Sequence, residues 1–215
     1  IDIQENIMQQ FLEESKKISR EIATLSGEKK DQVLLEMADA LMEHCDYIIT
    51  QNDKDMQAGQ QSGLSDALMD RLLLTGDRVA SMAQAIKEIA ALKDPVGRTL
   101  EGWVTQNGLN IQKVSIPIGV IGIIYESRPN VTSDTAALCF KSGNVCVLKG
   151  GKEAEHSNKA IANVLRNVLA KNKLPEQAIA LLPFSNRESV AHLIKQDKLV
   201  DLIIPRGGED LIRYI

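Results

Sequence analysis

Lys149–Gly150–Gly151–Lys152 follows a short apolar run and precedes a stretch of helical character, so it is predicted to form a turn between a strand and a helix. Glycines in such a turn let a ligand approach the main chain, and lysines pair with hydroxyl or phosphate oxygens. The segment has neither the G-x-G-x-x-G nor the G-x-x-x-x-G-K-[ST] spacing. A cofactor site and a plain turn with solvated lysines both remain open, and the local pattern slightly favours the plain turn.

Two further segments carry residues that could do chemistry. Arg206–Gly207–Gly208 is predicted to be either a main-chain anion site at a helix start or a turn that needs positive φ, with the turn slightly favoured. Asn130 is either an amide donor to a developing oxyanion or the N-cap of a helix that begins near Val131. Residue type alone favours the cap, because Asn is a preferred N-cap.

The elements that must position these residues alternate between strand and helix in the second half of the chain. Apolar runs at 119–125, 145–148, 178–182 and 200–204 are separated by helical patterns. This alternation predicts an α/β fold, a Rossmann-like open parallel sheet with helices on both faces. Ligands of such sheets bind beyond the carboxyl ends of the strands. The segment 185–188, Ser-Asn-Arg-Glu, is predicted to be a capping box.

The first half is predicted to be helical. Residues 31–49 have one apolar face and read as a single helix, with a start near Ser26. A second helical stretch, 66–92, is interrupted near Thr75 and ends before Pro95. Two short runs around Asn107–Gly108 predict a protruding β-hairpin with a type I′ turn.

Composition excludes several classes of function. The net charge of −4 gives no basic surface for nucleic acid and no polybasic membrane patch, and the longest apolar run is too short to span a bilayer. Cys45, Cys139 and Cys146 are far apart and fall in core-like patterns, which suits a reducing compartment. The scattered histidines indicate no metal site. The first residues do not resemble a signal peptide, so a cytoplasmic location is expected.

Three motifs together carry a resemblance to a known family. "YESRPNVT", "LKGGKEA" and "IPRGG" closely resemble segments of the gamma-glutamyl phosphate reductases, which belong to the aldehyde dehydrogenase superfamily. The likeness runs through the chain and is strongest from Pro117 onward. It implies NADPH-dependent reduction of L-glutamyl 5-phosphate to glutamate 5-semialdehyde and phosphate, in proline biosynthesis. In that reaction a cysteine attacks the acyl phosphate, phosphate leaves, and hydride reduces the thioester.

The resemblance also implies roles for particular residues. Asn130 matches the oxyanion donor, Lys149 matches the lysine that holds the adenosine ribose, and Gly207–Gly208 match a loop near the pyrophosphate. Lys152 occupies a position that is commonly acidic in relatives that use NAD, and a cation there suits the 2′-phosphate of NADPH. The residues implied to bind the cofactor are Ser127, Pro129, Lys149, Gly150, Gly151, Lys152, Arg206, Gly207 and Gly208.

Members of that family are about twice as long, and their nucleophilic cysteine matches none of the three present here. The chain is therefore expected to be a cofactor-binding half, inactive alone, with N-terminal helices (1–99), an oligomerisation hairpin (100–117) and a Rossmann-like domain (118–215). The resemblance implies a homodimer or higher homo-oligomer formed through the hairpin. The alternatives are another aldehyde dehydrogenase-like acyl reductase, or a non-catalytic nucleotide-binding or assembly module.

Overall fold

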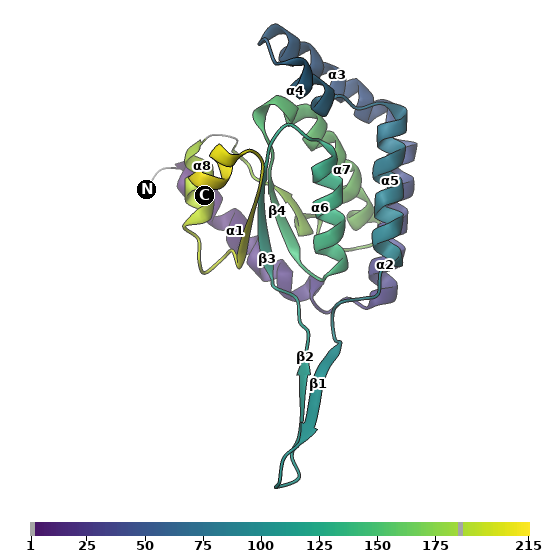
Figure 1. The fold of residues 1–215 in the computed structure, drawn as a ribbon, viewed down its shortest axis with the longest axis vertical. Coiled ribbons are helices and arrows are strands. Elements are labelled where there is room, and N and C mark those ends of the chain that lie inside the picture. Colours follow the sequence, from purple (N-terminus) through teal and green to yellow (C-terminus); the bar gives the residue numbers. More distant parts are fainter. Residues whose placement is uncertain (1–2, 185–186) are drawn as a thin grey trace.

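The computed structural model describes residues 3–184 and 187–215, and a parallel sheet of four strands lies at the centre of this part of the chain (Figure 1). The order across the sheet is β5-β4-β3-β6, which confirms the predicted parallel arrangement. The two central strands therefore place the loops that follow them side by side. The strands are β3 (Val120–Tyr125), β4 (Val145–Lys149), β5 (Ile179–Leu181) and β6 (Leu202–Arg206).

Helices cover both faces of the sheet, as predicted. All six residues of β3 and four of the five in β4 are buried, which fits the continuous apolar runs of these strands. α6 (Asn130–Lys141) lies in front of the sheet in Figure 1, and α1 (Ile3–Ile22) crosses behind it. The remaining elements of this half are η1 (Lys152–Ala154), α7 (Glu155–Lys171), η2 (Glu176–Ala178), α8 (Arg187–Ile194) and α9 (Glu209–Tyr214).

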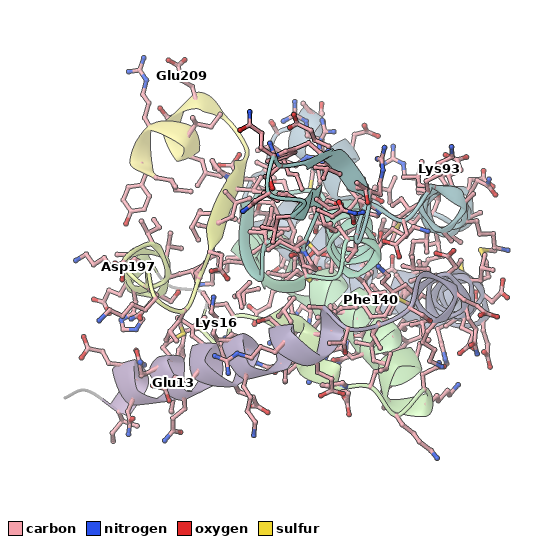
Figure 2. The ribbon with its side chains drawn as sticks, turned by 90° about the horizontal axis from the view of Figure 1, so that it is seen from below. Glu13, Lys16, Lys93, Phe140, Asp197 and Glu209 are labelled. Atoms are coloured by element: carbon pink, nitrogen blue, oxygen red, sulfur yellow. The ribbon has the colours of Figure 1, made fainter. Side chains whose placement is uncertain are left out.

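An ion pair fixes α1 to the sheet. Lys16 Nζ lies 2.6 Å from Asp201 Oδ1, and Asp201 Oδ2 accepts a hydrogen bond of 2.8 Å from the backbone N–H of Val120. Figure 2, seen from below, shows Lys16 on the side of α1 that faces the sheet. One carboxylate thus joins α1, the start of β3 and the segment before β6.

The N-terminal helices differ from the prediction in one respect. The expected single helix over 31–49 is two helices, because α2 ends at Glu43 and α3 begins at Cys45. His44 between them has φ −101° and ψ 19°. No glycine or proline marks this break, so the apolar periodicity continues across it and hides it. The helices of this region are α2 (Gly27–Glu43), α3 (Cys45–Gln61), α4 (Asp66–Leu72) and α5 (Gly76–Ala91).

The predicted helix start at Ser26 is confirmed, because Ser26 Oγ accepts from the N–H of Lys29 at 3.2 Å. Thr75, where only an interruption was predicted, caps α5 in the same way, and its Oγ1 accepts from the N–H of Arg78 at 3.2 Å. The interruption expected near Thr75 is the gap between α4 and α5. The capping box at 185–188 stays a prediction, because residues 185 and 186 lie outside the described residues.

The hairpin projects far from the rest of the molecule (Figure 1) and consists of β1 (Thr99–Val104) and β2 (Asn110–Val114), paired antiparallel. The type I′ prediction is wrong. Gly108 has φ +86°, but Asn107 is not in the positive-φ region, and the N–H of Gly108 donates to the carbonyl of Thr105 at 2.9 Å. The connection of residues 105–109 is longer than a two-residue loop, so only one left-handed residue is needed.

Buried lysines anchor the base of this hairpin. Lys30 is fully buried, and its Nζ lies 2.8 Å from Asp94 Oδ2, while Asp94 Oδ1 accepts from the N–H of Val96 at 2.9 Å. Lys141 donates to the carbonyl of Ala90 at 2.7 Å. Breaking such a pair would leave an uncompensated buried charge, so these contacts hold the chain firmly where it leaves the domain.

Candidate active site

The Lys149–Lys152 turn lies at the carboxyl edge of the sheet between two cavities. A strand-end cavity of about 760 Å³ is lined by both lysines and by residues of the loop after β3 and of α9, and a smaller turn cavity of about 90 Å³ lies on the β5 side. Lys149 is half-buried, and its ammonium group has no hydrogen-bond or ion-pair partner among the described residues. Burial lowers the pKa of Lys149, and the charge of Glu153 opposes that shift. A plain turn with solvated lysines therefore does not describe Lys149, although Lys152 is exposed.

The glycines of this turn are required by the chain's own side chains. A Cβ at Gly150 would lie 2.1 Å from Asn158 Nδ2, and one at Gly151 would lie 2.2 Å from Glu153 Oε1. Real Cβ atoms do not approach polar atoms so closely, so a larger residue would displace both neighbours. The sequence reasoning assigned these glycines to ligand approach, and the structure adds this close packing.

Glu153, which the sequence reasoning missed, joins the two central loops. Its Oε1 accepts from the N–H of Ser127 at 2.8 Å and from Ser127 Oγ at 2.6 Å. Burial alone would raise the pKa of Glu153, but the hydrogen bonds from Ser127 and the charge of Lys149 bring it below its usual value. Glu153 is therefore an ionised clamp that fixes the loop after β3 against the turn after β4.

A buried hydrogen-bond chain lies beneath this clamp. Tyr125 Oη and Thr132 Oγ1 are 2.6 Å apart, and Thr132 Oγ1 donates to Asn158 Oδ1 at 3.0 Å. Burial raises the pKa of Tyr125, so the phenol stays protonated. These three side chains come from β3, α6 and α7, so they hold the residues packed against the Lys149–Lys152 turn in one geometry.

Asn130 is the first helical residue of α6 and does not cap it. Pro129, which is buried, occupies the N-cap position, and no side-chain cap bond forms there. Asn130 Nδ2 instead donates to Asp134 Oδ2 at 3.0 Å. An amide nitrogen carries two hydrogens, so the second remains available to another acceptor. The cap alternative for Asn130 is thus wrong, and the geometry leaves an oriented amide donor at the helix start.

The loop after β6 already holds a carboxylate. The N–H of Gly208 donates to Glu126 Oε2 at 3.0 Å, and a Cβ at Gly207 would lie 2.6 Å from the same oxygen. Neither glycine has positive φ, so the alternative of a left-handed turn is wrong. Arg206, Gly207 and Gly208 line a cavity of about 350 Å³. Any external anion at this loop would meet the carboxylate of Glu126.

Arginines that the sequence reasoning did not select gather near Asn130. A cavity of about 410 Å³, here called the arginine cavity, opens between α4, α5 and α6, and its polar lining includes Asn130, Asp134, Arg71, Arg78 and Arg128. Nothing in the sequence signalled this cluster, because its members come from three elements that meet only in the fold. The cavity places cations beside the oriented amide.

The cysteines lie in environments that suppress their reactivity. Cys139 and Cys146 are buried and Cys45 is half-buried. Hydrogen bonding with Cys139 and burial raise the pKa of Cys146, and burial raises that of Cys45. In residues 3–184 and 187–215 no cluster of metal-ligating side chains is present, and no helix is long and apolar enough to cross a membrane.

Comparison with known proteins places the chain in a class. The model of the aldehyde dehydrogenase family matches residues 2–215, and the chain belongs to that family. Its relatives include the gamma-glutamyl phosphate reductases of Aliarcobacter butzleri and Sulfurimonas denitrificans, which are 69% and 65% identical to it over 208 residues, or 97% of the chain. The chain spans about half the length of these curated relatives, 50% and 51% respectively.

Solved structures give the same result. The crystal structure of gamma-glutamyl phosphate reductase from Thermotoga maritima superimposes with a TM-score of 0.94 at 35% identity, covering 96% of this chain and 50% of that one. The enzyme from Saccharomyces cerevisiae gives a TM-score of 0.88 at 34% identity, covering 96% of this chain and 53% of that one. The aldehyde dehydrogenase-like fold expected from the sequence is therefore confirmed.

Proposed function

We propose that this chain is the cofactor-binding half of an enzyme that reduces L-glutamyl 5-phosphate to L-glutamate 5-semialdehyde with NADPH. The observation that carries this proposal is the position of two groups at the carboxyl edge of one sheet. The oriented amide of Asn130 follows the loop after β3, and the half-buried Lys149 ends the neighbouring strand β4. The close relatives that bear the reductase name support the choice of substrate. We further assign the chain to the cytoplasm, with the three segments 1–99, 100–117 and 118–215.

The residues at the strand ends fit a dinucleotide. Lys149 has a cavity on each side and no partner among the described side chains, and Lys152 lies exposed at the rim of both cavities. Lys149 would bind the ribose hydroxyls and Lys152 the 2′-phosphate. When bound, the nicotinamide supplies the hydride. The hydrogen bond between Ser127 and Glu153 fixes the loop that carries Pro129 and Asn130 relative to the Lys149–Lys152 turn.

Asn130 stabilises the oxygen of the acyl group. One of its amide hydrogens is committed to Asp134, so the other points in a defined direction without further reorganisation. Cys139 and Cys146 are buried, and burial raises the pKa of Cys45, so none of the three cysteines has the environment of a nucleophile. We therefore place the nucleophilic cysteine outside this chain and expect the chain alone to be inactive.

The test is the reverse reaction, followed as NADPH formation from glutamate 5-semialdehyde, phosphate and NADP⁺ with the full-length enzyme. Turnover that needs both semialdehyde and phosphate is expected. An enzyme that oxidises simple aldehydes equally well, or that needs no phosphate, would be a different acyl reductase. The chain of 215 residues, assayed in parallel, should give only the blank rate. Turnover by this chain that Cys139→Ser or Cys146→Ser abolished would refute the assignment of the nucleophile.

A further inference from the structure

The arginine cavity has the size and polarity of a small-molecule site. Its volume of about 410 Å³ lies within the range of ligand pockets, and its apolar walls come from Leu73, Leu74, Met82 and Ala85. Asn130, the proposed oxyanion donor, lies in its lining. A molecule whose reacting oxygen meets Asn130 can therefore extend its other end into this cavity.

The three arginines of the cavity are not equivalent. Arg78 Nη2 donates to Asp70 Oδ1 at 2.7 Å and its Nη1 donates to the carbonyl of Leu73 at 2.8 Å, so its guanidinium holds the link between α4 and α5. The guanidinium groups of Arg71 and Arg128 have no hydrogen-bond or ion-pair partner among the described residues. Both also line the neighbouring cavity beside Arg206. Two guanidinium groups are thus available to a ligand.

The charges in the cavity fit an amino-acid group better than a phosphate. Asp70 and Asp134 lie in the same lining as the arginines, so the site presents both signs. A dianionic phosphate would be repelled by these carboxylates, whereas an α-carboxylate and α-ammonium pair complements them. Guanidinium groups bind carboxylates in a planar, often bidentate geometry.

We propose that Arg71 and Arg128 bind the α-carboxylate of the substrate and so select an amino-acid semialdehyde over a simple aldehyde. This inference rests on the proposed function for the reaction itself. It adds the residues that recognise the end of the substrate remote from the reacting carbon. Binding energy from that end fixes the acyl carbon relative to Asn130.

The reverse reaction separates the two anions, because the carboxylate belongs to the semialdehyde and the phosphate is a second substrate. In the full-length enzyme, Arg71→Gln and Arg128→Gln should each raise the KM for glutamate 5-semialdehyde about 10- to 100-fold. The KM for phosphate should change by less than about threefold, since an exposed charge acts weakly at a distance. The KM for butanal, which has no carboxylate, should not rise.

Arg20→Gln is the matched control, because Arg20 is an exposed arginine on α1 outside the cavity lining. Arg71→Lys keeps the charge and guards against a folding defect; it should give an intermediate KM. A rise in the KM for phosphate instead, or no rise in either KM, would overturn the inference. If the unaltered enzyme lacks the reaction, the proposed function fails. In that case the affinity for L-glutamate, measured by calorimetry, tests the arginine cavity. Arg71→Gln and Arg128→Gln should each weaken this binding, and Arg20→Gln should not.

Discussion

At the scale of single residues, we expect Lys152 to select NADPH over NADH. It is exposed, it is the first residue of η1, and it lines both cavities that flank the turn. A charge-assisted contact to a 2′-phosphate is worth about 1.5–3 kcal/mol, or roughly 10- to 150-fold in affinity. Lys152→Glu should therefore weaken NADPH binding at least 10-fold and NADH binding less, measured as Kd by fluorescence quenching at fixed salt.

Lys54→Glu makes the matched charge reversal at an exposed lysine of α3 and should leave both affinities unchanged. If Lys152→Glu weakened NADPH and NADH by the same factor, Lys152 would not read the phosphate. Glu153 is a second, local source of negative charge, because its carboxylate is ionised beside Lys149. The attraction of Lys152 for the 2′-phosphate must therefore exceed the repulsion from the carboxylate of Glu153.

Asn130 should affect rate without affecting stability. In the full-length enzyme, Asn130→Ala is expected to lower kcat on the order of 10²-fold, the usual effect of removing an oxyanion donor. A lost N-cap would instead cost about 1 kcal/mol of unfolding free energy, but Pro129 holds that position here. Thermal melts run beside the kinetics would decide, and a destabilised yet fully active variant would refute the catalytic role.

For Asp134, we expect a substitution to change stability in a way that depends on pH. Burial raises its pKa, although the hydrogen bond from Asn130 and the charge of Arg206 oppose the shift. A carboxyl whose pKa is raised on folding loses stabilising effect as pH rises through the folded pKa. Asp134→Asn should therefore raise Tm relative to the unaltered protein more at pH 7 than at pH 4. It should nearly keep kcat, because the new amide oxygen can accept from Asn130, whereas Asp134→Ala should lose about 10-fold.

Some residues of the candidate sites could be predicted from the sequence and others could not. Lys149 and Asn130 were selected as candidates because strand ends mark ligand sites in parallel sheets. Glu153 was overlooked because its role depends on a contact with Ser127, 26 positions earlier, that no local pattern encodes. Arg71 and Arg128 were overlooked for the same reason, since α4 and the loop before α6 meet only after folding.

At the scale of elements, α3 links the two candidate sites. Asp55 accepts from the N–H groups of His156 and Ser157 at 3.1 and 2.7 Å and so caps the start of α7, just after the Lys149–Lys152 turn. Asn52, one turn earlier, donates to the carbonyl of Leu72 and accepts from the N–H of Leu74, both at 2.8 Å. One polar face of α3 thus positions the helix that follows the Lys149–Lys152 turn and the wall of the arginine cavity.

Removing that cap should be costly. Asp55 is buried and also accepts from Ser157 Oγ at 2.6 Å, so Asp55→Ala leaves several donors unsatisfied. A loss of about 2 kcal/mol in the free energy of unfolding is expected, the upper end of measured cap effects. Urea denaturation measures it, with Asp53→Ala, an exposed neighbour on the same helix, as the control. A loss no larger than that of the control would show that the cap is dispensable.

Strands and helices were predicted correctly where one sequence pattern identified them. The four strands were recognised from their continuous apolar runs, the start of α2 from Ser26, and the interruption before α5 from Thr75–Gly76. The break at His44 was missed because no glycine or proline marks it and the apolar periodicity continues across it. The burial of Asn52 and Asp55 on α3 was also not predicted, because polar residues of a helix are expected to face solvent. Tertiary contacts made by polar groups decide these cases.

At the scale of the whole molecule, the hairpin exposes apolar side chains that no contact within the described part of the chain covers. Leu100, Trp103 and Val104 on β1 are 57%, 46% and 68% exposed. In the described part of the chain, neither strand of the hairpin pairs with any strand but its partner in the hairpin, so both outer edges are open. Apolar side chains on open edges are a template for pairing with another chain. We therefore expect the hairpin to hold subunits together.

Charge placed on that edge should separate the subunits. In the full-length enzyme, the double substitution Leu100→Lys and Val104→Lys should convert the oligomer to monomers, because paired copies would bury like charges. Gln106→Lys adds a cation to the exposed loop of the same hairpin and should leave the assembly intact. Sedimentation velocity at micromolar concentration measures both. The hairpin lies far from the sheet (Figure 1), so the Kd for NADPH should be unchanged in the separated subunits. An enzyme that stayed oligomeric with both lysines in place would assign assembly to another surface.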